Sequence, residues 1–387
     1  MTNWMQNKFL EWGLKVMFRR FQIFANTLLK RIMEYKPRIS YLRDQMSNSD
    51  LDTVFISSKE NIRYFSGFTG TFAFLIISDK KALIVTDSRY TIRATEECPN
   101  FEIYQIKAGI NWIENITKQI GTKILGFEGE NLAVNMLEQM KSKAPNVSEW
   151  KDFSDPVTQG RVIKSEEEVD IIKRTINISD SAFNEVSKVI TIGMTEKEIA
   201  WEIEKTMREL GAESPSFDTI VASGVNGAKP HHTPTDKKIE DNEGIVIDMG
   251  AKYEGYCSDL TRTIYIGEPS KKFREVYSTV HRAQLIAIET AQPDMTGEDL
   301  DALARTVISN AGFGENFGHS LGHGVGIAIH ENPTVGPTSK NIIKPGMIYT
   351  IEPGIYLENW GGVRIEDMML FTDSGNEILS HAIKEVF

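Results

Sequence analysis

An internal repeat in the second half of the sequence limits the folds that this chain can adopt. A predicted helix begins after Met194 and another after Met295, and glycines end them at Gly211 and Gly312, so both landmarks recur after 101 residues. Each helix opens with Thr-x-x-Glu or Thr-x-x-Asp, a pattern that caps helix N-termini. Each also follows another helix and precedes a hairpin-like segment. We therefore expect two αα-ββ halves related by a pseudo-twofold axis.

A separate α/β domain is predicted N-terminal to the repeat, over residues 37–160. With 387 residues, of which 41% are hydrophobic and 25% charged, the chain is long enough for two globular domains. A capping box at Ser165–Glu168 indicates where the second domain begins, and we assign it residues 161–387. The elements expected in the first domain are strands after Asp52, on both sides of 79–81 and over 123–130, and helices over 110–121 and 131–143.

The histidines place the chemistry in the second domain. None of the seven precedes His231, and three of them, His319, His323 and His330, lie within the glycine-rich segment 316–333. His319 and His323 are four residues apart, as on a zinc-binding helix, but no Glu follows His319 directly and four glycines favour an irregular segment. A mononuclear HExxH zinc site is therefore not expected.

Each half of the repeat contains a predicted hairpin that carries two carboxylates. In residues 243–267, a turn centred between Tyr253 and Glu254 would place Asp248 directly opposite Asp259. In residues 347–372, a turn centred on Asn359 would place Glu352 opposite Glu366. Both hairpins thus predict a pair of acids on one face of two apolar strands.

Paired acids on an apolar face need compensating positive charge, because burial of an unpaired carboxylate costs several kcal/mol. In the sequence no Lys or Arg is next to Asp248, whereas Arg262 and Arg364 lie near the other three acids. If the two hairpins meet, two divalent cations would nearly neutralise the four acids, and oxygen ligands with one imidazole suit Mn²⁺, Co²⁺ or Zn²⁺. The alternative is that each acid is solvated or salt-bridged at a sheet edge.

These residues resemble the ligand set of the pita-bread metallopeptidases, the family of methionine aminopeptidase, aminopeptidase P and prolidase. The resemblance covers residues 37–387, and NIRYFSGFTG (61–70) and DSRY (87–90) resemble the N-terminal domain of the prolidase, aminopeptidase P and creatinase branch. It implies a creatinase-like α/β domain followed by a pita-bread domain, an α/β (α+β) fold class. The motifs that carry it are IDMG, SDLTRT, GHSLGHGVG, EPGIY and GVRIED, in that order.

The resemblance also implies a role for each site residue. Asp259 and Glu366 would bridge two metal ions, Asp248 would complete the site of one, and His323 with Glu352 that of the other. Glu352 would also be the general base. The remaining implied catalytic residues are His231 lining the substrate site, His330 steadying the tetrahedral intermediate or the proline carbonyl, His319 as a wall of the proline pocket, and Arg364 beside the bridging glutamate.

The function that follows is that of an Mn²⁺- or Co²⁺-dependent Xaa-Pro dipeptidase, with Zn²⁺ as a third candidate metal. The alternative is an Xaa-Pro aminopeptidase acting on longer peptides, and the compact N-terminal domain inclines us to the dipeptidase. A methionine aminopeptidase and a non-catalytic binding protein are less favoured, the second because all five ligands are retained. His232, His281 and His381 have no motif around them and are expected to be ordinary.

Charge and cysteine usage limit the partners and the compartment. The net charge of −11 argues against nucleic acid, and two cysteines 159 residues apart, Cys98 and Cys257, favour a reducing cytoplasm. A homodimer is expected by resemblance alone.

The first 36 residues form a basic extension with seven Lys or Arg and two Glu. Charges interrupt its apolar runs, so neither a transmembrane helix nor a signal peptide is expected. One interpretation is an amphipathic helix on an anionic membrane surface. We favour two others, a loosely attached helix or an upstream start with Met33 as the true first residue.

Overall fold

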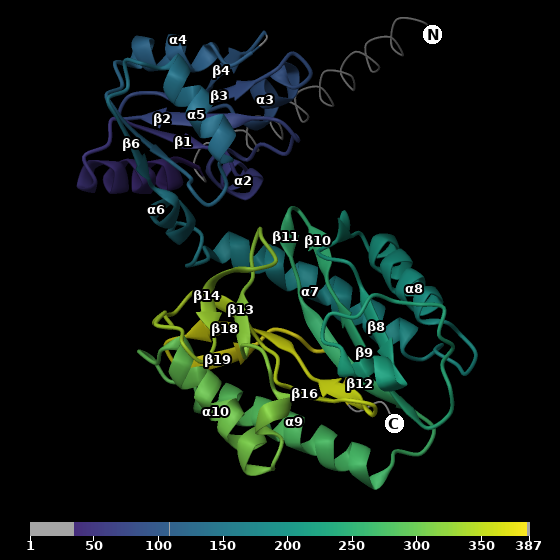
Figure 1. Cartoon of the computed structure of the whole chain (residues 1–387). Coiled ribbons are helices and arrows are strands. Elements are labelled where there is room, and N and C mark those ends of the chain that lie inside the picture. The colour runs from purple at the N-terminus through teal and green to yellow at the C-terminus, as the bar shows by residue number, and fades with distance from the viewer. Residues whose placement is uncertain (1–34, 108, 385–387) are drawn as a thin grey trace, which may run out of the picture. The chain divides into compact units, whose positions relative to one another are not determined.

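The computed structural model describes residues 35–107 and 109–384, which divide into two compact units between Gly160 and Arg161 (Figure 1). The predicted extension 1–36 lies outside the described residues except for residues 35 and 36, which belong to a helix over 35–48. Within the described ranges, no helix has the length and apolarity needed to cross a membrane.

The N-terminal unit is built on a six-stranded mixed sheet with the order β4-β3-β2-β1-β5-β6. The strands and helices predicted for it are all present, and apolar residues such as Phe55, Ile76 and Trp112 form its core. Its elements are β1 (Thr53–Ile56), α2 (Lys59–Ser66), β2 (Phe74–Ser78), β3 (Ala82–Thr86), α3 (Thr91–Glu97), β4 (Glu102–Gln105), α4 (Trp112–Ile120), β5 (Ile124–Phe127), α5 (Val134–Lys143), β6 (Glu149–Asp152) and α6 (Ser154–Gln159).

The C-terminal unit consists of two halves, each a pair of helices followed by strands. The first half contains α7 (Glu166–Val186), α8 (Glu196–Glu209), β7 (Ser214–Pro215), β8 (Ile220–Ser223), η1 (Gly224–Ala228), β9 (Glu243–Met249), β10 (Ala251–Tyr253), β11 (Tyr256–Cys257) and β12 (Leu260–Ile266). The second contains α9 (Lys271–Thr290), α10 (Gly297–Asn310), η2 (Gly314–Asn316), β13 (Gly322–Gly324), β14 (Glu331–Val335), β15 (Ile348–Ile351), β16 (Gly354–Leu357), β17 (Gly361–Arg364), β18 (Asp367–Thr372) and β19 (Gly375–Ile378).

The predicted repeat is confirmed at its helix termini. Capping boxes begin α7, α8 and α10, with Thr195 and Thr296 as the caps of the two repeated helices. Gly211 and Gly312 follow the helix ends with φ of 109° and 86°, a conformation that glycine adopts without strain. The strands of the two halves lie between the α7–α8 pair and the α9–α10 pair (Figure 1).

Of the two predicted hairpin registers, the first is wrong and the second is confirmed. In the first, Asp248 pairs with Thr261 and not with Asp259, so the predicted pairing is wrong by two residues. The turn is formed by Glu254 and Gly255, both with positive φ, one position later than expected. A shift of two residues keeps both aspartates on the same face of the hairpin.

The second hairpin has the predicted register. Ile351 pairs with Asp367 and Gly354 with Arg364, so Glu352 and Glu366 occupy facing positions between these pairs. The hairpins meet where β12 runs beside residues 364–366, since the Glu366 N–H donates to the Thr261 carbonyl at 3.0 Å. The fold therefore brings all four acids into one region.

Candidate metal centre

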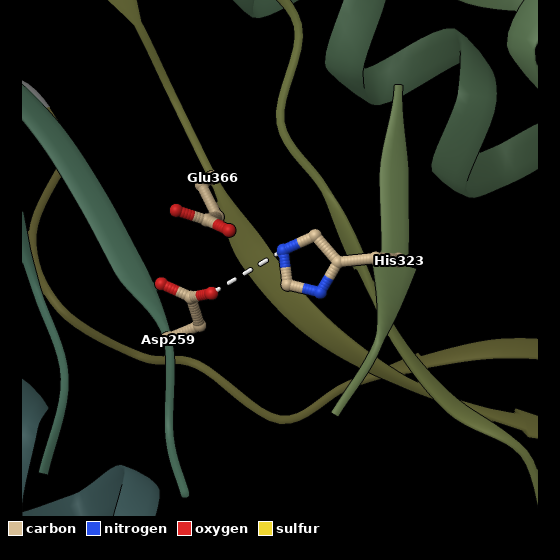
Figure 2. Close-up of side chains that lie close together, drawn as sticks. All are labelled: Asp259, His323 and Glu366. Carbon is tan, nitrogen blue, oxygen red and sulfur yellow. Dashed lines mark ion pairs between the residues drawn. The ribbon is translucent and has the colours of Figure 1, made fainter. Parts of the chain in front are cut away.

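Three of the predicted ligands form a compact cluster. One ligand atom from each of Asp259, His323 and Glu366 lies within 4.8 Å of the other two (Figure 2). Asp259 comes from the start of β12, His323 from β13 and Glu366 from the segment between β17 and β18. Both acids are almost inaccessible, with 5% exposure for Asp259 and 2% for Glu366. This burial contradicts the alternative of solvated acids at a sheet edge.

The other two predicted ligands lie at the same cluster. The Glu352 Oε1 atom is 3.4 Å from His323 Nε2, and it accepts a hydrogen bond from the Thr350 hydroxyl at 3.2 Å. Asp248 lies close enough to the cluster that its negative charge helps to raise the pKa values of both Asp259 and Glu366. All five predicted ligands are therefore brought together.

The orientation of His323 suits a metal ligand. Its Nδ1 lies 3.1 Å from the Gly324 carbonyl, so Nδ1–H is the donor and the Nε2 lone pair is left facing the acids. Nε2 is 3.5 Å from Asp259 Oδ2. A lone pair opposite ionised carboxylates is repelled unless a proton or a metal cation lies between them.

The glycines on both sides of His323 serve close backbone packing. A Cβ atom at Gly322 would lie 2.0 Å from the Thr350 carbonyl oxygen, and one at Gly324 would lie 2.2 Å from the Asn332 carbonyl oxygen. The ladder has a bulge between His323 and Gly324. The glycines predicted an irregular segment in place of a helix; residues 319–323 form no helix, but His323 lies in the short strand β13.

The electrostatics of the cluster disfavour four ionised acids. Burial and the neighbouring carboxylates raise the pKa of Asp259 and of Glu366 well above their usual values. Burial also raises the pKa of Glu352 to about 8 and lowers that of His323 to about 4. For Asp248 burial raises the pKa although Arg364 opposes it.

Positive charge from bound cations would lower the pKa values of these acids again, and the donor atoms present suit such cations. One imidazole nitrogen faces Asp259 and Glu352, and Glu366 lies in the same cluster. Asp248 Oδ1 is a buried atom without a hydrogen-bond partner among the described residues. Hard oxygen donors with a single imidazole are typical ligands of divalent first-row metals. The residues present thus fit divalent metal ions.

Arg364 connects this cluster to the predicted substrate side. Its Nη2 lies 2.6 Å from Asp248 Oδ2, its Nε donates to the Thr261 hydroxyl at 3.0 Å, and its Nη1 donates to the Tyr356 hydroxyl at 2.8 Å. The Thr261 hydroxyl in turn donates to Glu366 Oε2 at 2.7 Å. Although Arg364 is two residues from Glu366 in the sequence, its ion-pair partner is Asp248 of the other half.

Arg262 has a different role from the one that its sequence position indicates. It is fully buried and pairs with Asp367 at 2.7 Å, while Nη1 donates to the Glu366 carbonyl. Neighbouring residues in a strand point to opposite faces, so Arg262 lies behind the acids and supports the Glu366 backbone.

The three other histidines of the predicted site lie around the cluster. His330 packs against His323 with ring centroids 4.2 Å apart, and His319 Nε2 lies 3.0 Å from the Tyr356 hydroxyl. Burial, then the charge of Arg364, lowers the pKa of His319 to about 4. His231 is exposed. Its charge lowers the pKa values of Asp248, His319 and His330, which places it near the same site.

Sequence reasoning missed Tyr356, although the signal was present. Tyr356 lies in EPGIY, four residues after Glu352, and a period of two places both on one strand face. Gly354 between them makes room, because a Cβ atom there would lie 2.6 Å from the Tyr356 hydroxyl. His232, expected to be ordinary, is buried and contacts Glu196, a residue that no motif marked.

Comparisons with known proteins match both units of the chain to sequence families. Residues 170–373 match the sequence family described as "Metallopeptidase family M24". Residues 38–163 match the family described as "Creatinase/Prolidase N-terminal domain". The Xaa-Pro dipeptidase of Pyrococcus furiosus is 41% identical over 353 residues, which cover 91% of this chain and 99% of that protein.

Solved structures with similar folds carry two different activity names. An Xaa-Pro dipeptidase from Bacillus anthracis has a TM-score of 0.88 at 39% identity, covering 91% of this chain and 99% of its own. An X-Pro aminopeptidase from Thermotoga maritima has a TM-score of 0.85 at 40% identity, and the match covers 90% of this chain and 99% of that one. These two neighbours represent both of the activities that the sequence left open.

Proposed function

Because this chain belongs to metallopeptidase family M24, we propose that it hydrolyses the bond between an N-terminal residue and a following proline in Xaa-Pro dipeptides. The observation that carries the proposal is the convergence of Asp259, His323 and Glu366, with Glu352 beside His323. The name of the 41% identical relative supports the choice of substrate.

Two divalent cations are proposed as the cofactor, with Mn²⁺ or Co²⁺ preferred and Zn²⁺ as a third candidate. Asp259 and Glu366 would bridge them, Asp248 would complete the site of one, and His323 with Glu352 that of the other. When bound, the cations would polarise the scissile carbonyl and lower the pKa of the attacking water. Four acids give about four negative charges, which two divalent cations balance.

Glu352 is the proposed general base. Its carboxylate would take one proton as water attacks the carbonyl carbon, and would pass it to the proline nitrogen as the C–N bond breaks. The amide nitrogen of an Xaa-Pro bond has no hydrogen, so this proton makes the leaving group a secondary amine. The Thr350 hydroxyl, 3.2 Å from Glu352 Oε1, keeps the carboxylate oriented.

The histidines are proposed to hold the substrate around this base. His231 would line the substrate site and His330 would steady the tetrahedral intermediate or the proline carbonyl. His319 would form one wall of the proline pocket, because Phe317 packs edge-on against it at 5.0 Å between ring centroids and Tyr356 fixes its Nε2. Arg364 would keep Asp248 in place beside them.

Amino-acid release by the metal-loaded protein tests the proposal. Ala-Pro, Ala-Pro-Ala and Met-Ala-Ala would each be incubated with the Mn²⁺-loaded chain and with a chelated control. Release from Ala-Pro alone is the expected result. Strong release from Ala-Pro-Ala would assign the Xaa-Pro aminopeptidase activity named for the Thermotoga maritima neighbour.

Two further results would overturn the assignment. Cleavage of Met-Ala-Ala alone would indicate a methionine aminopeptidase. A protein that binds metal but cuts none of the three peptides would indicate a binding protein, since fold alone does not fix function.

We also propose a homodimer in a reducing cytoplasm. The dimer rests on family resemblance, and the compartment on two cysteines that are both buried. Light scattering after size exclusion distinguishes the 43.7 kDa chain from a particle of twice that mass.

A further inference from the structure

Glu196 lies outside the metal cluster, at the first position of α8, and its residue surface is fully buried. Its carboxylate accepts six hydrogen bonds from a single segment that begins at Ser223, the last residue of β8. Oε1 accepts from the Ser223 N–H, the Ser223 hydroxyl and Asn226 Nδ2, and Oε2 from His232 Nε2, the Thr235 N–H and the Thr235 hydroxyl, all at 2.7–3.0 Å.

This loop, residues 223–235, carries His231 to the metal centre. Of its two adjacent histidines, His232 is 7% exposed and its Nε2 lies 2.9 Å from Glu196 Oε2, whereas His231 is exposed. An ionised carboxylate only accepts, so the His232 ring must donate. Fixing one histidine on Glu196 thereby directs its neighbour away from α8.

The opposite side of the same loop is held by the second half of the unit. Arg364 Nη1 donates to the Pro230 carbonyl at 3.4 Å, directly before His231. Gly227 approaches β17 so closely that a Cβ atom on Gly362 would lie 2.1 Å from the Gly227 carbonyl oxygen. The loop is thus fixed between α8 and β17, with His231 between the two attachments.

We propose that Glu196 is a positioning residue for His231: its buried carboxylate anchors loop 223–235 and thereby holds the imidazole at the substrate side of the metal centre. The proposal rests on the proposed function, because His231 is assigned to the substrate site there. It requires no contact of Glu196 with metal or substrate.

The chemistry of the anchor specifically requires a carboxylate. All six partners donate to the carboxylate, and on either side one of them is a backbone N–H, so the NH₂ group of a glutamine would face a donor that cannot accept and that bond would be lost. An unsatisfied buried donor costs more than the bond itself contributes. In agreement, although burial acts to raise it, hydrogen bonds from Ser223 and His232 lower the pKa of Glu196 to about 2.

Hydrogen exchange tests the anchor without reference to activity. In Glu196→Gln, we expect faster amide exchange at Ser223 and Thr235, whose N–H groups donate to the carboxylate. The matched control is Glu198→Gln on the same helix turn, where the same change is made at a residue that bonds to Thr195 and not to the loop. Unchanged exchange in Glu196→Gln would overturn the proposal.

A double-mutant cycle with His231→Ala tests the functional step. In the wild-type background, Glu196→Gln should lower kcat/KM for Ala-Pro by about 100-fold with the bound metal content unchanged. In the His231→Ala background the same substitution should change kcat/KM by less than about 2-fold, because the group that it positions is gone. Effects that multiply in the double variant would overturn a role through His231.

Two additions keep the outcome decisive. If Glu196→Gln fails to fold, Thr235→Val removes a single hydroxyl donor and should act in the same direction by about 3- to 10-fold, again only when His231 is present. If the wild-type chain hydrolyses none of the peptides, the proposed function fails, and the exchange experiment by itself decides whether Glu196 anchors the loop.

Discussion

At the residue scale, His323 is the only nitrogen donor of the proposed ligand set. Its Nε2 faces Asp259 and Glu352 at 3.5 and 3.4 Å, and no second imidazole nitrogen belongs to the three-residue cluster found among the described residues. Loss of this ring would remove one ligand of the metal shared with Glu352. The remaining acids would still be buried together and would still repel one another.

We expect His323→Ala to reduce Ala-Pro hydrolysis by at least about 10³-fold, because the cations supply several kcal/mol of transition-state stabilisation. Circular dichroism should be unchanged, since the substitution removes a partly exposed ring, and bound metal measured by mass spectrometry should fall. His381→Ala, on an exposed residue, is the control. Full turnover by His323→Ala would end the proposal of a paired metal site.

The pH dependence of stability provides a second test at this scale. Glu196 has a folded pKa of about 2, against 4.5 for an unperturbed glutamate. A lowered folded pKa means that its contribution to stability is complete above pH 4.5 and is lost as the pH falls toward 2. In metal-free protein, thermal denaturation should therefore show a steeper loss of stability in this window for the wild type than for Glu196→Gln. Parallel curves would contradict this.

At the residue scale, sequence reasoning placed two of the proposed ligands correctly relative to each other but missed how Arg364 is held. Glu352 and Glu366 could be placed opposite each other because that hairpin has no irregularity between Ile348 and Arg364 that changes its register. Arg364 could not be assigned to Asp248, because their contact joins two halves separated by 116 residues. A pattern within one strand contains no information on such a contact.

At the element scale, each repeated helix contacts one loop that carries a histidine proposed to line the substrate site. On α10, Asp301 binds Arg305 through two hydrogen bonds of 2.6 and 2.8 Å, and the guanidinium donates to the carbonyls of Phe317 and His319, each at 2.8 Å. On α8 the corresponding anchor is Glu196. The two anchors occupy different positions within their helices, so the repeat conserves the function of the helix and not the residue.

Arg305→Lys should therefore weaken the loop of His319. Lysine has no planar fork, so it cannot bind Asp301 and both carbonyls at once. We expect a loss of about 2 kcal/mol in the free energy of unfolding by urea, together with a KM for Ala-Pro raised about 3- to 10-fold. Thr306→Ala, on the exposed face of α10, controls for changes in the helix itself. A KM equal to that of the control would refute the link between this helix and substrate binding.

The register of the first hairpin was mispredicted because its turn could be placed at more than one pair of residues. The residues 252–255 all suit a turn, and charge and glycine content alone do not select the central pair. The choice of Glu254 and Gly255 depends on positive φ at both positions, with values of 45° and 77°. The paired strands Lys252–Tyr253 and Tyr256–Cys257 then fix the register.

At the scale of the whole molecule, the two compact units have separate hydrophobic cores. One cluster, with Phe55 and Trp112, belongs to the N-terminal unit, and the clusters with Phe273 and Ile199 belong to the C-terminal unit. The family match to the creatinase/prolidase domain ends at residue 163, close to the division at Gly160. The capping box at Ser165 lies just after this division, and it is a local signal that can be read from the sequence.

The separate cores lead to a prediction about unfolding. Since every proposed ligand lies in residues 161–387, bound metal should stabilise that unit only. Calorimetry of the wild type should then show two transitions. At a free Mn²⁺ concentration 100-fold above its dissociation constant, one transition should gain about 2.7 kcal/mol and rise by roughly 5–10 °C, while the other stays in place.

The control for this experiment is His323→Ala, in which the same Mn²⁺ concentration should raise the C-terminal transition by less than in the wild type and leave the other in place. A single wild-type transition that shifts as a whole would mean that the two units unfold together, so that the division at Gly160 would not mark independent folding units. A shift of both transitions in His323→Ala would instead mean that Mn²⁺ binds outside the proposed centre.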